Sequence, residues 1–256
     1  MKNKTSTYVK YAIGEIALVM VGILLALQVS NWNQNLQKEA LELDLLQKLK
    51  EDLSSMYGDV SNDLKTMKLG ERSYFRIQDY IKEKRVYNDS MSFDFHWLIK
   101  DEYIYPGTST YDLMKREGLN IVKNDSIRNG IQIAFENIFP RLIRTNAFYP
   151  NIEEFFSPYF QQNFSPNDNK ELIFKEQFPG YVHTFPYKKK VNGKEYYITI
   201  GYKPKDFEKL KKDPEFLMLM HQSYTYRAYK INRYKYAEYI IEELSRMIDK
   251  ELEKRL

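Results

Sequence analysis

The chain contains no cysteine, three histidines and few glycines, and each shortage excludes a kind of chemistry. Without cysteine it has no thiol nucleophile, no thiolate metal ligand and no disulfide bond. The histidines, His96, His183 and His221, are too far apart in the sequence for their spacing to predict a metal site. Glycine-rich phosphate loops, the H-E-x-x-H and G-x-S-x-G motifs and calcium-binding loops are also absent. We therefore predict no catalytic, metal-binding or cofactor-binding residue, and an enzyme would need a site that these motifs do not mark.

The charges of the chain almost cancel. The formal net charge of the 256 residues is +4, and the first 30 residues, with three lysines and one glutamate, supply half of it. The rest of the chain lacks the basic excess that is typical of nucleic-acid binding, so we expect no nucleic-acid partner. Hydrophobic residues make up 43% of the chain, which is typical of a folded protein and not of a disordered one.

The longest apolar run lies near the N-terminus, where every residue from 16 to 27 is apolar or glycine. Tyr11 and Trp32 would lie roughly 31 Å apart along a helix, which matches a hydrocarbon core of roughly 30 Å with an aromatic residue at each surface. No small-x-small cleavage site follows the run, which disfavours a signal peptide. We predict a transmembrane helix over residues 11–30 that contacts the lipid bilayer. The predicted membrane-interface residues are Tyr11, Asn31, Trp32 and Asn33.

The distribution of lysines predicts how the span is oriented. Three lysines and no acidic residue precede the span, whereas the 17 residues that follow Val29 hold one lysine and three acidic side chains. By the positive-inside rule, residues 1–10 form a short cytoplasmic tail and residues 31–256 form an extracytoplasmic domain. In a bacterial cell, this predicts a single-pass inner-membrane protein whose C-terminal domain is periplasmic or otherwise extracytoplasmic.

Glu15 is the one ionisable residue inside the apolar run. At 100° per residue, Gly22 and Ala26 fall within roughly 20° of Glu15 around the helix, and Ser30 extends the same row of small side chains. Small residues in such a row let a second helix approach closely. We predict that Glu15, Gly22, Ala26 and Ser30 form a packing face for a second copy of this chain or for another membrane protein. The alternative is that Glu15 lies one turn inside the membrane surface and extends its carboxylate to water.

Two stretches carry motifs that can be compared with a known family. The first begins Y-x-x-G-E-I and ends Q-x-x-N-W-N, and the second is TYDLMKREGLNIVKNDSIRNGI at residues 110–131. Both resemble a family of bacterial single-pass membrane proteins of unknown function. The resemblance implies a membrane anchor followed by a helical domain, and it implies no activity. The matching positions of the first stretch are Tyr11, Gly14, Glu15, Ile16, Gly22, Gln28, Asn31, Trp32 and Asn33.

The rest of the chain is predicted to be mainly α-helical, a bundle of long helices that follows the transmembrane helix. A helix over residues 34–84 continues directly from the span, because apolar residues recur there at steps of three and four. Asn124 is expected to cap a helix that begins at Asp125 and runs on to about Leu142, and Asp213-Pro214 to open a last helix that ends near Arg255. Six tyrosines between residues 224 and 239 are spread around that last helix, so we predict broad burial and no single stacking platform. The predicted buried seam of the first helix is Leu46, Leu49, Leu53, Met56, Val60, Leu64 and Met67.

One small β-hairpin insertion is predicted at about residues 181–202. Asn192-Gly193 is a strong signal for a hairpin turn between strands over residues 181–191 and 194–202. Three lysines at 188–190 form a basic tip, which we interpret either as a solvated turn or as an edge that binds a partner. The alternation of four large side chains predicts one buried face. These side chains are Tyr196, Ile198, Ile200 and Tyr202.

Three hypotheses for the function remain open. The first is a membrane-anchored interaction or scaffold protein that assembles through its transmembrane helix and its helical domain. The second is a small-molecule sensor with a site near residues 119–122 or near the aromatic segment 151–163, which would signal through a membrane partner because only residues 1–10 precede the span. The third is an enzyme with an unrecognised site, for which no catalytic carboxylate is nominated because the acidic residues occupy mostly exposed helical positions.

Overall fold

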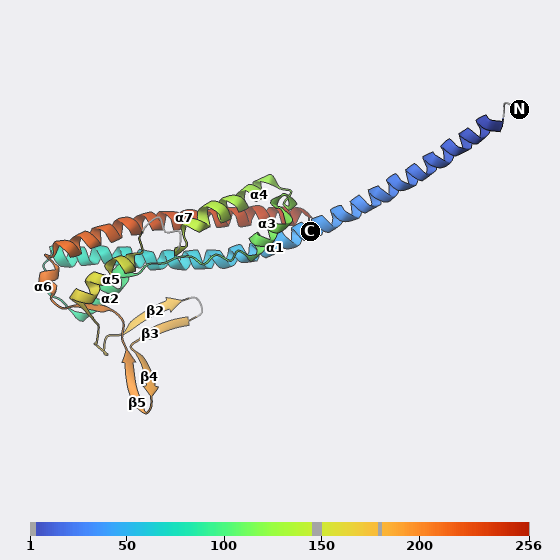
Figure 1. Ribbon diagram of the computed structural model, residues 1–256. Helices are drawn as coiled ribbons and strands as arrows, with labels where there is room; N and C mark the ends of the chain where they lie inside the picture. The colour runs from blue at the N-terminus through green and yellow to red at the C-terminus, as the bar shows by residue number, and fades with distance from the viewer. Residues whose placement is uncertain (1–3, 145–149, 179–180, 256) are drawn as a thin grey trace.

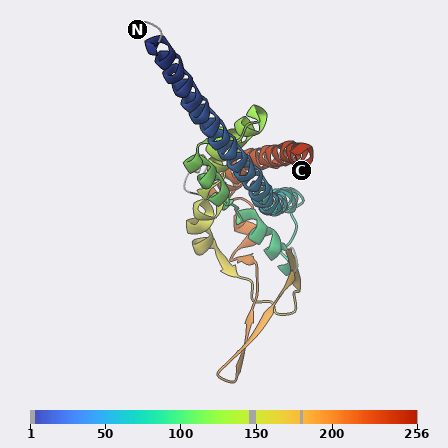
Figure 2. The ribbon, with the colours of Figure 1, turned by 90° about the vertical axis from the view of Figure 1, so that its right-hand side faces the viewer.

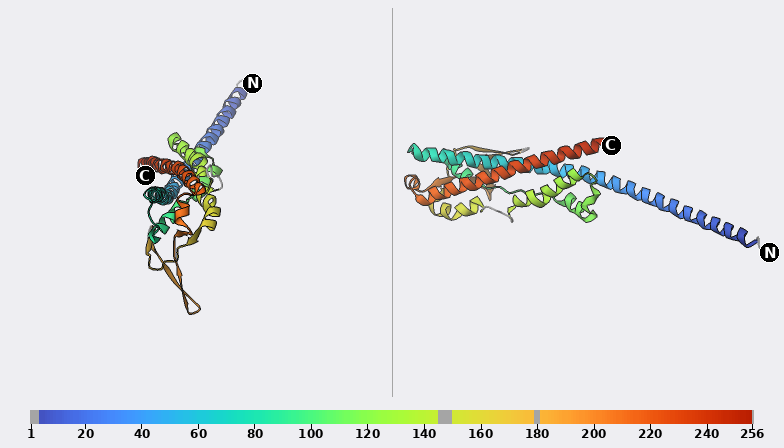
Figure 3. Two further views of the ribbon diagram at one scale, coloured as in Figure 1. Left: turned by 90° about the vertical axis from the view of Figure 1, so that its left-hand side faces the viewer. Right: turned by 90° about the horizontal axis from the view of Figure 1, so that it is seen from above.

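Two long antiparallel helices form the frame of the molecule. The computed structural model describes the backbone of residues 4–144, 150–178 and 181–255, and the side chains of these residues except for 4–12, 176–178 and 181. Helix α1 (Lys4–Lys82) is a single helix of 79 residues, and α7 (Pro214–Arg255) has 42 residues. The two lie side by side over the inner half of α1 (Figures 1 and 3). The prediction of a mainly α protein is therefore confirmed.

Shorter elements cover one side of this helix pair. Asn124 caps α4 as predicted, because its side-chain oxygen accepts hydrogen bonds from the backbone N–H groups of Ser126 and Ile127. Gly118 ends α3 with a φ of 89°, a conformation that favours glycine. The helical elements are η1 (Asp89–Met91), α2 (Ser92–Ile99), α3 (Ser109–Glu117), η2 (Leu119–Ile121), α4 (Asp125–Gln132), the π-helical turn η3 (Ile133–Ile138), η4 (Phe139–Arg141), α5 (Ile152–Asn163) and α6 (Phe207–Leu210).

The core has two parts that are arranged along the helix pair. The first part contains the whole predicted seam of α1, together with the facing residues of α7, α3 and α4. Every residue of that seam is at most 4% exposed, so the helical period identified the buried face correctly. The second part is aromatic and gathers α2, α5, α6 and β1 around the far end of α1 and the start of α7. Each fully buried apolar side chain contributes about 1.5–3 kcal/mol, so this seam is the main source of stability.

The strands form three separate antiparallel pairs, not one long hairpin. They are β1 (Phe164–Pro166) with β6 (Tyr202–Pro204), β2 (Phe174–Phe178) with β3 (Tyr181–Phe185), and β4 (Tyr187–Val191) with β5 (Lys194–Ile198). The predicted strand 181–191 is divided at Pro186, which has no N–H to donate to a ladder. Its first half pairs with β2 and only its second half with β5. The Asn192-Gly193 turn is as predicted, with φ angles of 49° and 80°.

The prediction of a buried hairpin face is wrong for two of its four side chains, whereas Ile200 and Tyr202 are partly buried and Tyr202 packs against the aromatic part of the core. Tyr196 is 52% exposed and Ile198 is 48% exposed. The reason is visible in Figures 1 and 2, where β4 and β5 project away from the helices, so that no described element packs against them. The expectation for the tyrosines of α7 is also wrong in part. Tyr234 is fully buried, but Tyr229, Tyr236 and Tyr239 are each about half exposed, because they lie on the side of α7 that faces away from α1.

The N-terminal part of α1 makes no contact with the bundle. Every side chain from residue 13 to residue 38 is exposed, and an 18-residue window within this part has a mean hydropathy of 2.1. Figure 1 shows this segment leaving the bundle next to the C-terminus and continuing as a straight helix. It is therefore long and apolar enough to cross a membrane, and within the described structure it is not a buried core helix.

A substitution of Gly70 can test how closely α1 and α7 approach each other. A Cβ atom at this position would lie 2.7 Å from the Cζ atom of Arg227 and 2.8 Å from the backbone oxygen of Trp97, and the backbone cannot move aside easily. We expect Gly70→Ala to lower the free energy of unfolding by about 1–3 kcal/mol through this overpacking. Gly58→Ala is the matched control on the same helix, since a Cβ atom added there would meet nothing within 4 Å.

Chemical denaturation of the purified full chain measures both variants. Gly58→Ala should be neutral or stabilising by up to about 1 kcal/mol, because alanine is the better helix former. Equal stability of the two variants would show that α1 and α7 are not held together as closely at Gly70 as the structure has them.

Candidate functional site

The residues that the sequence predicts to lie within or next to a membrane are all on the part of α1 that projects from the bundle. Glu15, Gly22, Ala26 and Ser30 are all exposed, and a Cβ atom added at Gly22 would meet nothing within 4 Å. Asn31, Trp32 and Asn33 follow them and are equally exposed. The side chain of Tyr11 lies outside the described residues. The structure thus places this predicted packing face on one helix, and no described part of the chain covers it.

A cluster of charged residues connects the end of α7 and the segment before α4 to the part of α1 just beyond the predicted span. Glu42 is 1% exposed, and it is ten residues, or roughly 15 Å of helix, beyond Trp32. Its Oε2 atom lies 2.8 Å from the Nη2 atom of Arg255, and its Oε1 atom accepts a 2.8 Å hydrogen bond from the backbone N–H of Lys123. Lys123 also forms an ion pair with Glu39. We call Glu39, Glu42, Lys123 and Arg255 the junction cluster.

The junction cluster connects the stretch 110–131 to α1 just beyond residues 11–33. Lys123 belongs to the stretch 110–131, and Glu39 and Glu42 lie on the turns of α1 that follow the first stretch. Arg255 is in the last turn of α7, so the C-terminal end of that helix is attached to α1 at the same place. The cluster therefore ties three segments together where the bundle faces the predicted membrane.

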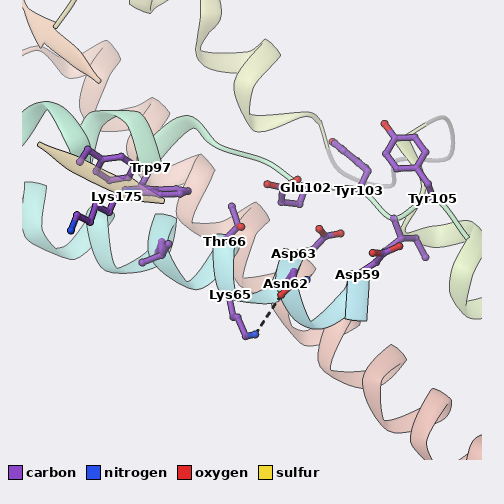
Figure 4. A pocket seen from close by; sticks show the side chains of 13 residues that line it. Asp59, Asn62, Asp63, Lys65, Thr66, Trp97, Glu102, Tyr103, Tyr105 and Lys175 are labelled. Carbon is purple, nitrogen blue, oxygen red and sulfur yellow. Dashed lines mark hydrogen bonds between the residues drawn. The ribbon is translucent and has the colours of Figure 1, made fainter. Parts of the chain in front are cut away.

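A pocket lies between the middle of α1 and the extended segment 100–108, which we call the strap. Its volume is about 560 Å³, and Figure 4 shows the strap crossing above the helix. The pocket is not at either place that the sequence suggested for a ligand. Val122, in the corner at residues 119–122, is fully buried in the core. The segment 151–163 buries most of its aromatic side chains in the second part of the core, and it also borders two other hollows of about 420 Å³ and 410 Å³. The pocket is lined by Asp59, Asn62, Asp63, Lys65, Thr66, Leu69, Trp97, Glu102, Tyr103, Ile104, Tyr105, Phe174 and Lys175.

Two cations of α7 hold the strap in place. Arg227 is fully buried, and its Nη2 atom donates hydrogen bonds of 2.6 Å and 2.9 Å to the backbone oxygens of Leu98 and Lys100. Burial lowers the pKa of Arg227 to about 10, which leaves it charged at neutral pH. The Nζ atom of Lys230 lies 2.5 Å from the Oδ1 atom of Asp101, with side chains that are 8% and 1% exposed. These contacts fix where the strap begins and how far it stands from α1.

Asp101 also fixes the strap to α5. Its Oδ2 atom accepts a 2.9 Å hydrogen bond from the backbone N–H of Ile152 and a 3.1 Å hydrogen bond from the hydroxyl of Tyr103. The general expectation that acidic residues are exposed is therefore wrong for Asp101, and it is also wrong for Glu42 and Asp94. Sequence reasoning missed these buried charges because their partners are far away in the chain. The only local signal was the presence of Arg227 and Lys230 on an otherwise apolar face of the last helix.

The carboxylate of Asp63 has an unusual environment inside the pocket. Burial raises its pKa to about 7, and the nearby charges of Glu102 and Asp59 act in the same direction. The hydroxyl of Tyr234 donates a 3.2 Å hydrogen bond to the Oδ2 atom of Asp63 and, with the charge of Lys230, partly opposes this shift. Asp63 therefore titrates near neutral pH, where ordinary aspartates are fully ionised.

His96 belongs to the core and not to a site. It is 7% exposed and packs among Trp97, Phe174 and Tyr202. Burial lowers its pKa to about 4, so it is neutral at physiological pH. Within the part of the chain that the structure describes, no group of three or more His, Asp or Glu side chains is arranged to hold a metal ion.

Comparisons of the chain with models of protein families, with curated proteins and with solved structures found no match. The function must therefore be argued from the geometry of α1, the junction cluster and the pocket.

The contact between Lys230 and Asp101 predicts a large effect of one substitution. Lys230→Met would leave the carboxylate of Asp101 buried without its cation, and we expect a loss of about 3–5 kcal/mol in the free energy of unfolding. Lys235→Met, on an exposed position of the same helix, should change it by no more than about 0.5 kcal/mol. Urea denaturation of both variants measures the difference. A loss below about 1 kcal/mol for Lys230→Met would mean that the strap is not held by this ion pair.

Proposed function

We propose that the protein is a single-pass membrane protein of the bacterial cell envelope that acts by interaction and not by catalysis. Its N-terminus would be cytoplasmic, the span would cross the inner membrane, and the helical domain would lie outside the cytoplasm. The observation that carries the proposal is the continuity of α1. One helix is exposed over residues 13–38, which include the apolar run at 16–27, and then supplies the buried seam of the bundle from residue 45 onward.

This continuity gives the domain a defined position relative to a membrane. No loop separates the predicted span from the bundle, and the junction cluster begins within about 15 Å of Trp32. A flexible linker would let the domain turn freely, whereas a continuous helix holds the same face of the bundle at the same height above the bilayer. A fixed face at a fixed height is suited to assembly with other components that are held in the same membrane.

The predicted partner in the membrane is a second copy of this chain or another membrane protein. The face of Glu15, Gly22, Ala26 and Ser30 supports this, because the bundle leaves it uncovered and small side chains permit close helix packing. A carboxyl group on that face gains from a hydrogen-bonding partner within the bilayer.

A sensor of small molecules is the second candidate function, and the pocket favours it. Asp59, Asp63 and Thr66 of the pocket lie on the same unbroken helix as the predicted span. A ligand held between α1 and the strap would therefore contact the element that enters the membrane. Such a sensor would signal through a partner in the membrane that contacts the predicted span.

The orientation can be tested directly because the chain has no cysteine. We expect Ser54→Cys, on an exposed position of α1 beyond the span, to react with a membrane-impermeant maleimide in cells whose cytoplasmic membrane is intact. Thr5→Cys should react only after that membrane is disrupted. The reverse pattern would place the domain in the cytoplasm and overturn the lysine argument, and labelling of both cysteines in intact cells would argue against a span.

The packing face can be tested by crosslinking through Ser30→Cys in isolated membranes. We expect an oxidant to produce a disulfide-linked dimer if the partner is a second copy, and Gly22→Ile to reduce the yield severalfold because the larger side chain separates the helices. Leu24→Ile is the matched control, since Leu24 lies about 180° from Glu15 around the helix. Equal yields for the two variants would exclude this face as the contact. Absence of any dimer would leave another membrane protein as the proposed partner, to be identified by co-purification that Gly22→Ile weakens.

A further inference from the structure

We propose that the pocket between α1 and the strap binds a small organic cation, an amine or a quaternary ammonium compound. This proposal goes beyond the membrane assembly proposed above and would give the sensor candidate a class of ligand. It concerns the folded domain alone, so its test does not depend on the orientation of the span.

The size and the walls of the pocket suit a small organic molecule. A volume of about 560 Å³ is within the usual range of small-molecule sites. One side is formed by α1 and the opposite side by the strap, and Trp97 lies at one end. The ring of Phe174, which also lines the pocket, lies 5.8 Å from that of Trp97. Leu69 and Ile104 add further apolar surface. The pocket therefore has the mixture of apolar walls and a few polar groups that ligand sites share.

Two aromatic residues of the strap border the pocket. Tyr103 and Tyr105 belong to the strap, and Tyr105 is 82% exposed although it borders the pocket. A cation over an aromatic face within about 6 Å gains about 0.5–2 kcal/mol, more when it is shielded from water. An exposed tyrosine at the rim of a pocket can close over a ligand without disturbing the core, so Tyr105 is well placed for this role.

The charges that face the space between α1 and the strap are negative. Figure 4 shows the carboxylates of Asp59, Asp63 and Glu102 in this space, whereas the side chains of Lys65 and Lys175 point away from it. The ammonium group of Lys65 donates a 3.4 Å hydrogen bond to the side chain of Asn62 on the outer side of the helix. The nearby ammonium group of Lys230 is already paired with Asp101, so the carboxylates that face this space favour a cation.

The strap already binds an ammonium group that belongs to the chain itself. The Nζ atom of Lys230 lies 3.6 Å from the centre of the Tyr103 ring and 2.5 Å from the Oδ1 atom of Asp101. This contact combines an aromatic face with a carboxylate, the same two groups that line the pocket nearby. It is an independent observation, because it shows that this part of the fold accommodates an ammonium group in a desolvated position.

The environment of Asp63 adds a dependence on pH. Its pKa of about 7 results from burial and from the charges of Glu102 and Asp59, against the opposing effects of Tyr234 and Lys230. Tyr103 and Tyr105 complete the titratable groups that face the pocket from the strap. A cation prefers the ionised form of Asp63, so binding releases a proton at pH 6 and releases almost none at pH 8. With a pKa near 7, the ionised fraction of Asp63 rises about tenfold between pH 6 and pH 8, and the affinity for the cation should rise with it.

The test is calorimetric titration of the full chain in detergent micelles with choline, and with 3,3-dimethylbutanol, which has the same shape but no charge. We expect saturable binding of choline that is about tenfold tighter at pH 8 than at pH 6, and binding of the neutral compound that is at least about tenfold weaker. Spermidine and benzylamine extend the test to other amine shapes.

Two variants and one control connect the binding to the pocket. Asp63→Asn retains an oxygen that accepts from Tyr234, and it should weaken choline binding about tenfold at pH 8 and remove its pH dependence. Tyr105→Leu, at an exposed position, should weaken it about two- to fivefold. Glu51→Gln, an exposed acidic position of α1 outside the pocket, should have no effect.

Three outcomes would overturn the proposal. They are no saturable binding of any of the three amines up to about 10 mM, equal affinity for the neutral compound, or unchanged binding by a folded Asp63→Asn variant. Circular dichroism and the unfolding temperature establish that each variant is folded. Because the titration uses the purified chain, a negative result leaves the labelling test of orientation unaffected, and the two proposals fail separately.

Discussion

The packing of α1 against α7 is the contact on which the rest of the structure depends. Neither helix has a stable fold of its own in water, because most of the stability of such a helix comes from the burial of its apolar face. Here the seam from Leu45 to Met67 is buried against α7 and the short helices beside it. Every other feature is attached to this pair. The cations of α7 hold the strap, the last turn of α7 holds the junction cluster, and α1 itself leaves the bundle as the apolar segment.

Buried charges determine how the strap lies across this pair. Placing an ion pair in the interior removes both charges from water, and hydrophobic residues of similar size often give equal or greater stability. Such a pair is therefore better understood as a geometric restraint than as a source of stability. The ion pair with Lys230 restricts where Asp101 can lie. Arg227 reaches two backbone oxygens because Gly70 leaves room for its guanidinium group. The strap is consequently held at a distance from α1 that leaves a pocket open between them.

The sequence was sufficient for the features that depend on local pattern. The buried seam of α1 follows from helical periodicity, and the cap at Asn124 and the turn at Asn192-Gly193 follow from backbone chemistry. The features that it could not supply are those made by distant segments. Lys230 and Asp101 are 129 residues apart, and the pocket joins α1, the strap and β2. The burial of a strand face also depends on what packs against it, and for this reason the alternation in β5 predicted a buried face where the structure has an exposed arm.

The same two helices connect the pocket to the end of the bundle that lies next to the predicted span. Lys230, which holds the strap, and Arg255, which contacts Glu42, are both on α7, while Asp63 and Glu42 are both on α1. A ligand that changes the spacing of strap and α1 acts on the contact between these helices. Packed helix pairs respond to such a change by small shifts of one helix along the other rather than by gradual deformation. Arg255 is paired with Glu42 roughly 15 Å beyond Trp32. A shift of α7 along α1 must therefore either break that ion pair or move the C-terminal end of the predicted span. The junction cluster is therefore the place where an event in the pocket and an interaction in the membrane would affect each other.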